Sequence, residues 1–371
     1  MYGTAEVGLG NIHRGVRFGE LAMKLIDQIP CKEAECSTIS LSATTLLHWK
    51  TPFREISPIL VQALNSGFEL GDVVHGSACM ASCNYLRYTL GENLESLEAF
   101  IRSTYSRICD LGQDAMIRWA QPSMQFVLNM RSTAMDWKDL TILTGDTMNE
   151  EEFMQEATET NHKILLMMAW TYKSLLAYHF GYFEMAATMY ENLATKGLAY
   201  GSSYGAAPYY FYGAMIFYER YRSTGKHKHL RTVRKHMKGL KRLEAVGSPN
   251  VSAYLVFLQA EDKSLKSRDA ATLVAAYTKA IDAMKAERFV HLEFLANERL
   301  SVVLALLGFH DELAKTYLEQ AMFLCRYQWG ASAKYDWLQM QHTQFAARVS
   351  TQHREADRRN YSRTGPDRPP L

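Results

Sequence analysis

The sequence predicts an all-α fold in which antiparallel helix pairs stack into an α-solenoid. Apolar residues recur at helical spacing nearly throughout the chain, and no long run alternates apolar and polar residues as a half-buried strand would. The length of 371 residues also exceeds the roughly 250–300 residues at which one compact core stops growing. A stack of helix pairs avoids that limit because each pair packs on its neighbours.

The predicted helices form about seven or eight pairs. In the first half we expect pairs at 2–13 with 16–29, 33–49 with 53–69 and 72–90 with 94–111, followed by an unpaired helix at 114–135. In the second half we expect 150–180 with 183–197, 206–224 with 227–245, 250–266 with 269–286, 289–307 with 311–328, and a last helix at 331–345.

These helices divide the chain into four parts. N-terminal helical repeats occupy 1–135, a polar break follows at 136–149, and C-terminal helical repeats occupy 150–345. Residues 346–371 form a tail with six arginines among polar residues and a proline-rich end. Such a segment cannot bury enough apolar surface to order itself, so we predict a disordered basic tail.

The predicted turns carry residues that end or begin helices. Gly91, Gly181 and Gly308 each lie where one helix stops and the next begins, which is the usual place of a glycine that adopts a left-handed conformation. Pro52 lies in a first helical turn, where proline is tolerated. Asn149, followed by a glutamate at 152, is a candidate capping box.

A rhythm of small and large residues recurs around these turns. It is clearest in Trp170, Ser174, Gly181, Ala186, Tyr190 and Leu193. The same spacing returns in Gly308, Ala314, Leu318 and Ala321, in Leu273, Tyr277 and Ala280, and in Ile56, Leu60 and Ala63. Tetratricopeptide units of about 34 residues place small residues where their two helices cross. We therefore favour a tetratricopeptide-like solenoid over an ordinary helical bundle.

Several segments resemble one protein family. They are HWKTPFRE at 48–55, ALNSGFELGD at 63–72, FVHLEFLANERL at 289–300, YQWGA at 327–331 and GASAK at 330–334. Together they resemble the helical-repeat region of large signalling proteins that join a serine/threonine kinase-like domain, an AAA-type ATPase, a GAF sensor and a histidine kinase. The resemblance spans most of residues 10–340 and implies a scaffold or regulatory linker. The family's catalytic residues have no matching positions in this chain.

No motif in the sequence indicates catalysis. There is no glycine-rich loop ending in Gly-Lys-Ser/Thr, no His-Arg-Asp and no Asp-Phe-Gly. The nearest approach to a nucleophile elbow, at 200–205, reads as a loop between helices. Glu293 and Glu298 face different sides of a predicted helix, where we expect capping and surface charge. We therefore predict no catalytic residue, no cofactor and no enzymatic activity in this chain.

We also predict no metal site. Cys79 and Cys83 lie one helical turn apart with His75 as a possible third ligand, but small buried cysteines at helix contacts are far commoner than metal ligands. The remaining candidates, His227, His229 and His236, lie among cations that disfavour a metal ion.

The segment 220–242 departs most from the average charge. It holds ten lysines and arginines, three histidines and no acid, whereas the rest of the chain carries a net charge of about −8. On the predicted helix 227–245, an apolar stripe is formed by Leu230, Val233, Met237, Leu240 and Leu243. The opposite side carries the candidate partner-binding residues Arg231, Arg234, Lys235, Lys238, Lys241 and Arg242.

This basic side has four interpretations. It is a solvated outer wall, or it binds an acidic protein, an anionic membrane surface or RNA. Aromatic residues do not interleave with the cations, which weakens the nucleic-acid interpretation.

Composition and the ends of the chain add the remaining expectations. There is no apolar run of about 18 residues and no signal peptide, so we expect no membrane span and a cytoplasmic location with reduced cysteines. The chain starts abruptly in a helical pattern, which suggests a fragment of a longer protein or a truncated gene product.

The predicted function is a non-catalytic helical-repeat scaffold for protein–protein interaction or regulation in signal transduction. Two alternatives stay open. The chain is a piece of an ATP-dependent kinase or ATPase polypeptide whose catalytic domains lie elsewhere, or it is a small-ligand sensor with a pocket between helices. The sequence does not identify the partner or the oligomeric state.

Overall fold

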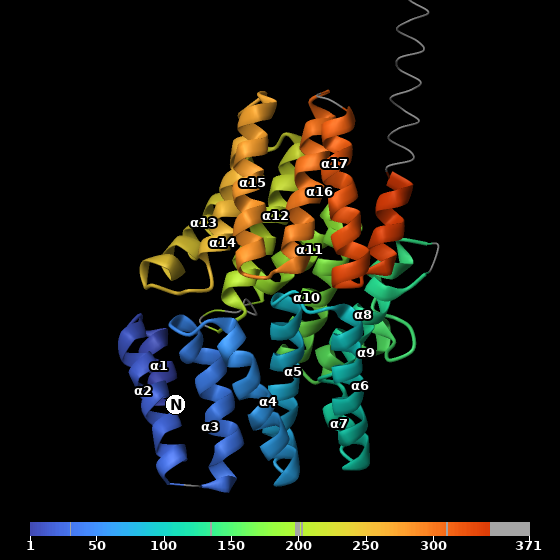
Figure 1. The fold of residues 1–371 in the computed structure, drawn as a ribbon. Helices are drawn as coiled ribbons and strands as arrows, with labels where there is room; N and C mark the ends of the chain where they lie inside the picture. The colour runs from blue at the N-terminus through green and yellow to red at the C-terminus, as the bar shows by residue number, and fades with distance from the viewer. Residues whose placement is uncertain (30, 134–135, 197–200, 202, 309–310, 342–371) are drawn as a thin grey trace, which may run out of the picture.

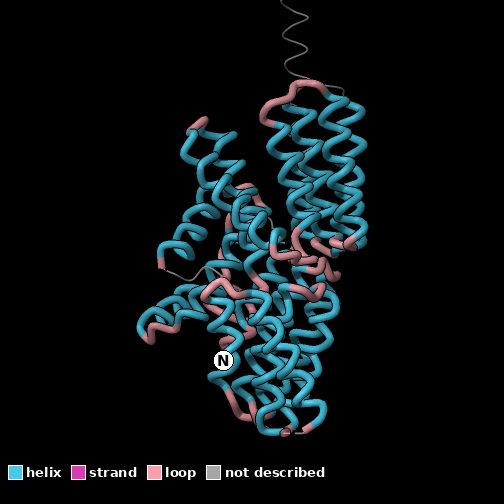
Figure 2. The backbone as a smooth tube through the Cα atoms, turned by 90° about the vertical axis from the view of Figure 1, so that its left-hand side faces the viewer, coloured by secondary structure: helices cyan, strands magenta, loops and turns pink. Residues whose placement is uncertain are grey.

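The computed structural model describes residues 1–29, 31–133, 136–196, 201, 203–308 and 311–341. These residues are mostly helical and contain no strand (Figures 1 and 2). Helices that follow one another in the chain pack as neighbours, so the prediction of an all-α helical-repeat fold is confirmed. The predicted tail at 346–371 lies outside the described residues.

The first half of the chain runs from α1 to the short helix η2. Its elements are α1 (Tyr2–Gly8), α2 (Ile12–Gln28), α3 (Lys32–Thr45), η1 (Leu47–Trp49), α4 (Phe53–Glu69), α5 (Val73–Thr89), α6 (Leu94–Asp110), α7 (Asp114–Ile117), α8 (Gln121–Arg131) and η2 (Asp139–Thr141).

The second half runs from α9 to the end of the described residues. Its elements are α9 (Glu150–Glu159), α10 (Lys163–His179), α11 (Phe183–Thr195), α12 (Ala206–Thr224), α13 (His227–Ala245), α14 (Ser252–Ser264), α15 (Ala270–Ala286), α16 (Val290–Leu306), α17 (Asp311–Phe323) and the π-helical η3 (Leu324–Trp329). Residues 332–341 are helical again.

The predicted core positions are confirmed. Gly91, Gly181 and Gly308 have φ values of +76°, +80° and +69°, and the Asn149 side chain accepts hydrogen bonds from the first amides of α9. The other residues of the repeat rhythm are buried, except Leu318, which is half-buried; of the turn glycines themselves, Gly181 is half-buried and Gly308 is exposed. The periodic pattern therefore identified the faces that the helices bury against one another.

Some predicted boundaries are wrong. The predicted single helix at 150–180 is two helices, α9 and α10, because Asn161 adopts a left-handed conformation with φ of +49°. Asparagine tolerates this conformation without the steric cost of most residues, so the chain turns without a glycine. The predicted helix 2–13 ends at Gly8, and the predicted helix 114–135 is divided into α7 and α8. The predicted helix 311–328 is helical throughout, with its last residues in the π-helical η3.

One predicted pairing is also wrong. Helix α5 packs mainly on α4 and much less on α6, although the sequence predicts that 72–90 pairs with 94–111. The reason is a pair of facing glycines. A Cβ on Gly67 would lie 3.2 Å from the Cα of Gly76, and a Cβ on Gly76 would lie 2.5 Å from the Phe68 ring. Without side chains at these positions, α4 and α5 approach closely.

The two halves of the chain also meet directly, at a surface that we call the junction. Asn250 accepts a hydrogen bond from the Phe53 amide at 2.8 Å, and it donates to the carbonyls of His48 and Thr51 at 2.9 and 3.0 Å. Asn93 donates to the Gln328 carbonyl at 3.0 Å. Figure 1 shows α1–α7 in its lower half and α12–α17 in its upper half, meeting at these helix ends. The stack is therefore not limited to contacts between successive pairs.

The predicted polar break at 136–149 contains η2 and packs against α8. Leu140, Leu143 and Met148 are buried, and Asn129 of α8 donates to the carbonyls of Leu140 and Ile142 at 3.0 and 2.7 Å. In the described part of the chain, no helix is long and apolar enough to span a lipid bilayer.

Candidate interaction face on α13

The six predicted partner-binding cations lie on the solvent side of α13. Arg231, Arg234, Lys235, Lys238, Lys241 and Arg242 are all exposed; we call these six residues the basic face. On the opposite side Val233, Leu240 and Leu243 are buried, while Leu230 and Met237 are half-buried. The predicted separation of the two sides of the helix is therefore confirmed.

Close packing on α12 fixes the orientation of α13. A Cβ on Gly239 would lie 2.6 Å from the Tyr210 ring, and a Cβ on Gly213 of α12 would lie 2.7 Å from the His236 ring. Glycine at each position lets one helix accept an aromatic ring of the other. The inner side of α13 is thereby filled, so the cations can point only toward solvent.

Although Glu244 lies on the same helix, the basic face forms no ion pair within the described part of the chain. Among the described residues, no ion pair or side-chain hydrogen bond is formed by any of its six cations. The two arginines that precede it behave differently: Arg220 pairs with Glu184 at 3.1 Å, and Arg222 pairs with Glu219 and Glu261. Uncompensated cations on one surface produce a positive potential that attracts acidic partners.

The two inward-facing histidines of α13 add no charge at neutral pH. Burial, followed by the nearby Lys235, lowers the pKa of His236 to about 4. Burial and neighbouring cations also lower the pKa of His229. The charge of the helix therefore comes from its lysines and arginines.

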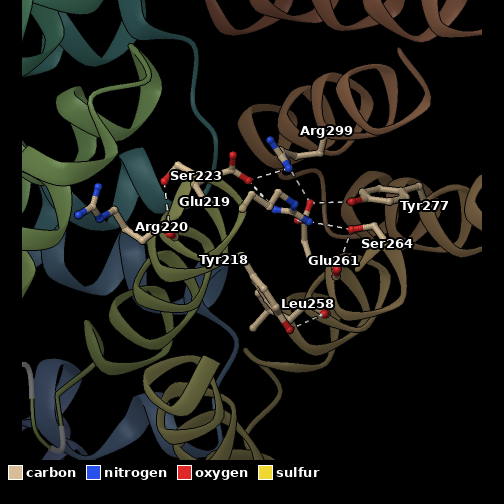
Figure 3. Close-up of polar contacts among 10 residues, drawn as sticks. Tyr218, Glu219, Arg220, Ser223, Leu258, Glu261, Ser264, Tyr277 and Arg299 are labelled. Atoms are coloured by element: carbon tan, nitrogen blue, oxygen red, sulfur yellow. Dashed lines mark hydrogen bonds and ion pairs between the residues drawn. The ribbon is translucent and has the colours of Figure 1, made fainter. Parts of the chain in front are cut away.

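A buried ion cluster connects α12 with α14 and α16 (Figure 3). Glu261 of α14 lies at its centre: its carboxylate is 2.6 Å from Arg222 Nη2 and 3.1 Å from Arg299 Nε. Arg299 Nη2 is 2.7 Å from Glu219 Oε1, and the Tyr277 hydroxyl donates to Glu261 at 2.8 Å. Two arginines and two glutamates make the cluster neutral overall.

The opposite charges in this cluster offset the cost of burying the ionised side chains. Burial raises the pKa of the Glu261 carboxyl, but Arg222 and Arg299 lower it more, so the net pKa is below its usual value. Burial lowers the pKa of Arg299, and Glu219 and Glu261 more than reverse that effect. Neighbouring charges also raise the pKa of Arg222, so Glu261, Arg222 and Arg299 are all charged at neutral pH. The cluster fixes α12, and with it α13, relative to α14 and α16.

A second buried ion pair contradicts the prediction that Glu298 carries surface charge. Glu298, predicted to carry surface charge, is 7% exposed and lies 2.6 Å from Lys334 Nζ. Lys334 also donates to the His179 carbonyl at 2.6 Å. Glu293 is also buried, at 8% exposed. Helix α16 is apolar on nearly every side, and charges on such a helix require buried partners. The presence of charged residues in this apolar helix is therefore the feature of the sequence that indicates buried ion pairs.

Aromatic and histidine side chains fill the junction. The Tyr88 hydroxyl lies 3.0 Å from the Tyr212 hydroxyl and 3.3 Å from His179 Nε2. The Trp329 ring lies 5.4 Å from the His179 ring and 6.0 Å from the His291 ring. Burial lowers the pKa of His291 to about 3. The segments 48–55, 289–300 and 327–334, which carry the family resemblance, all contribute residues to the junction.

The remaining predicted candidates do not come together. Cys79 and Cys83 are buried, whereas His75 is exposed and its Nδ1 lies 2.9 Å from Asp72 Oδ1. The described residues contain no group of three or more histidines, cysteines, aspartates or glutamates that could hold a metal ion. The loop at 200–205 includes positions outside the described residues.

Comparison with models of known protein families finds no match, and comparison with curated protein sequences finds none either. The family resemblance of the helical segments therefore stays a prediction.

Proposed function

We propose that this chain is a non-catalytic helical-repeat scaffold that binds an acidic surface of a protein partner through the basic face of α13. The observation that carries the proposal is the combination of six exposed cations, none with an ion pair among the described residues, and a helix whose other side is packed on α12. The backbone of this surface is already ordered, so a partner that docks has to order only the side chains of the cations.

The surroundings of the basic face favour a protein over a membrane or a nucleic acid. A helix that binds a bilayer inserts its apolar side among the lipids, but the apolar side of α13 is buried in the protein, with Val233 2% and Leu240 0% exposed. Binding of single-stranded nucleic acid usually uses aromatic side chains on which bases stack, and no aromatic residue belongs to the basic face. An acidic protein segment requires only exposed cations.

The resemblance to the repeat region of kinase-containing signalling proteins supports a role in signal transduction and a cytoplasmic location. It also leaves the possibility that kinase or ATPase domains act elsewhere in a longer polypeptide. For the chain itself we expect no ATP binding in calorimetry. Micromolar affinity for ATP, retained after repurification and removal of any tag, would overturn the non-catalytic assignment.

The proposal is tested by affinity capture with two charge-reversed variants. The first replaces four residues of the basic face by glutamate: Arg231, Arg234, Lys235 and Lys238. The matched control replaces four exposed cations on α2, α3 and α15 by glutamate: Arg17, Lys24, Lys32 and Lys279. Both variants undergo the same change in net charge, so a general effect of charge appears in both.

We expect the basic-face variant to lose most of the protein that the parent captures, and the control variant to keep it. Exposed charges contribute little to folding, and the apolar side of α13 is unchanged, so the unfolding midpoints of all three proteins should be similar. Equal capture by the basic-face variant and the parent would mean that this surface is only a solvated outer wall.

A further inference from the structure

A second charged surface lies on α9 and the loop that precedes it. Residues 136–159 contain eight acids and one lysine, a net charge of −7. Glu150 pairs with Lys173, and Glu156 pairs with Arg118. The exposed acids without an ion pair among the described residues include Asp146, Glu151, Glu152 and Glu159; we call these four residues the acidic face.

The acidic face is held as firmly as the basic face. Phe153 and Ala157 are buried, which anchors the inner side of α9. The Leu143 amide donates to Glu150 at 2.7 Å, and the Glu150 amide donates to Thr144 at 3.0 Å. The loop and the helix therefore form one surface.

The two faces are opposite in charge and comparable in length. With a rise of 1.5 Å per residue, Glu151 and Glu159 lie about 12 Å apart along α9, and Arg231 and Arg242 lie about 16 Å apart along α13. The six cations and three of the four acids stand on helices, whereas Asp146 lies in the loop before α9. Two such faces side by side bring several opposite charges together at once.

Within one molecule the two faces do not meet. Helix α13 lies at the left edge in Figure 1, and α9 lies on the right. Among the described residues, no hydrogen bond or ion pair joins residues 136–159 to α13. Two surfaces on different sides of one molecule can contact each other only when they belong to different molecules. When the two surfaces are unlike, each molecule can use one surface to bind a second copy and the other surface to bind a third.

We propose that the basic face of one copy binds the acidic face of a second copy of this chain, so that the scaffold assembles head to tail. The inference rests on the proposed docking role of α13 and identifies its occupant. Each copy contributes one of each face, so the contact extends into an open chain or closes into a ring. The attraction is between exposed charges, so salt weakens it as the screening length falls.

The test is sedimentation velocity on the purified chain and two reversed variants. The basic-face variant carries Arg231, Arg234, Lys235 and Lys238 replaced by glutamate. The acidic-face variant carries Asp146, Glu151, Glu152 and Glu159 replaced by lysine. Unfolding midpoints are measured for each, so that loss of association is separated from loss of folding.

We expect the parent to sediment faster as its concentration rises at about 50 mM salt, and to become monomeric at about 500 mM, where the screening length is only a few Å. Each variant alone should be monomeric, because its two faces then repel those of its neighbours. An equimolar mixture of the two should associate again, because the intact basic face of one meets the intact acidic face of the other.

A parent chain that stays monomeric at low salt would overturn self-assembly, while the capture experiment with the basic-face variant would still decide whether α13 is a docking face. A parent that associates, but whose variants do not associate when mixed, would show that other surfaces form the contact and would also overturn the inference.

Discussion

Replacing Glu261 by glutamine removes one negative charge from the buried ion cluster and keeps the size and shape of the side chain. Glu261 is 0% exposed and contacts both Arg222 and Arg299. The variant leaves two buried arginines with only Glu219 as a charged partner. The glutamine oxygen can still accept the hydrogen bond from Tyr277, so the main change is the lost charge.

The expected cost follows from burial. Removing one partner of a buried ion pair typically destabilises a protein by about 3–5 kcal/mol, because an uncompensated charge stays inside. The adjacent residue provides the control. Asp262, on the outer side of the same helix, pairs with Lys266 just beyond its end, with side chains 42% and 71% exposed. Such exposed pairs contribute about 0–1 kcal/mol. Glu261→Gln should therefore destabilise several times more than Asp262→Asn.

The assay is equilibrium unfolding in urea, followed by circular dichroism. A further variant combines Glu261→Gln with Arg299→Gln, which leaves Glu219 and Arg222 as a neutral pair. We expect this double variant to be more stable than the sum of the two single changes predicts, since the buried charges again cancel. Equal unfolding midpoints for Glu261→Gln and Asp262→Asn would refute the claim that the cluster is buried and ionised.

Three further predictions concern packing, the junction and pH. Ala186→Leu should destabilise by about 1–3 kcal/mol in urea unfolding, because Ala186 is 0% exposed and overpacking has this cost; an unchanged midpoint would refute the helix crossing assigned there. Gly91→Ala should destabilise the protein more than Gly71→Ala. Both glycines have similar positive φ values, but only the new Cβ at Gly91 would meet His291, at 2.7 Å. Equal unfolding midpoints for the two variants would contradict that contact. The pKa values of His236 and His291 are lowered to about 4 and about 3. The free energy of unfolding should therefore be highest above about pH 6.5 and should decrease by about 2 kcal/mol per histidine as the pH falls to 5. Unfolding midpoints that do not change between pH 7 and pH 5 would exclude buried neutral histidines.

The fold was predictable because the pattern that specifies it is local. The spacing of Ile56, Leu60 and Ala63 is set by the helix itself, and all three are 0% exposed. The same reasoning located the basic face, since the two sides of one amphipathic helix can be read from its own residues. Local pattern was misleading at Asn161, where a left-handed asparagine ends a helix without glycine or proline.

Contacts between distant segments were not predictable in the same way. Glu298 and Lys334 are 36 residues apart, and periodicity does not indicate which charge on one helix meets which charge on another. The junction depends on side chains such as Asn250 that contact residues about 200 positions away. The acidic face became recognisable only when the structure placed α9 away from α13.

The central claim, that α13 is a docking face, is tested most directly by the ionic-strength dependence of binding. The affinity of the captured acidic protein for the parent chain and for the basic-face variant is measured at about 50 and about 500 mM salt, a range over which the screening length falls from above ~10 Å to a few Å. The account predicts that the parent binds strongly only at low salt, and that the variant binds weakly at both. Equal affinity of the two proteins at low salt would contradict it.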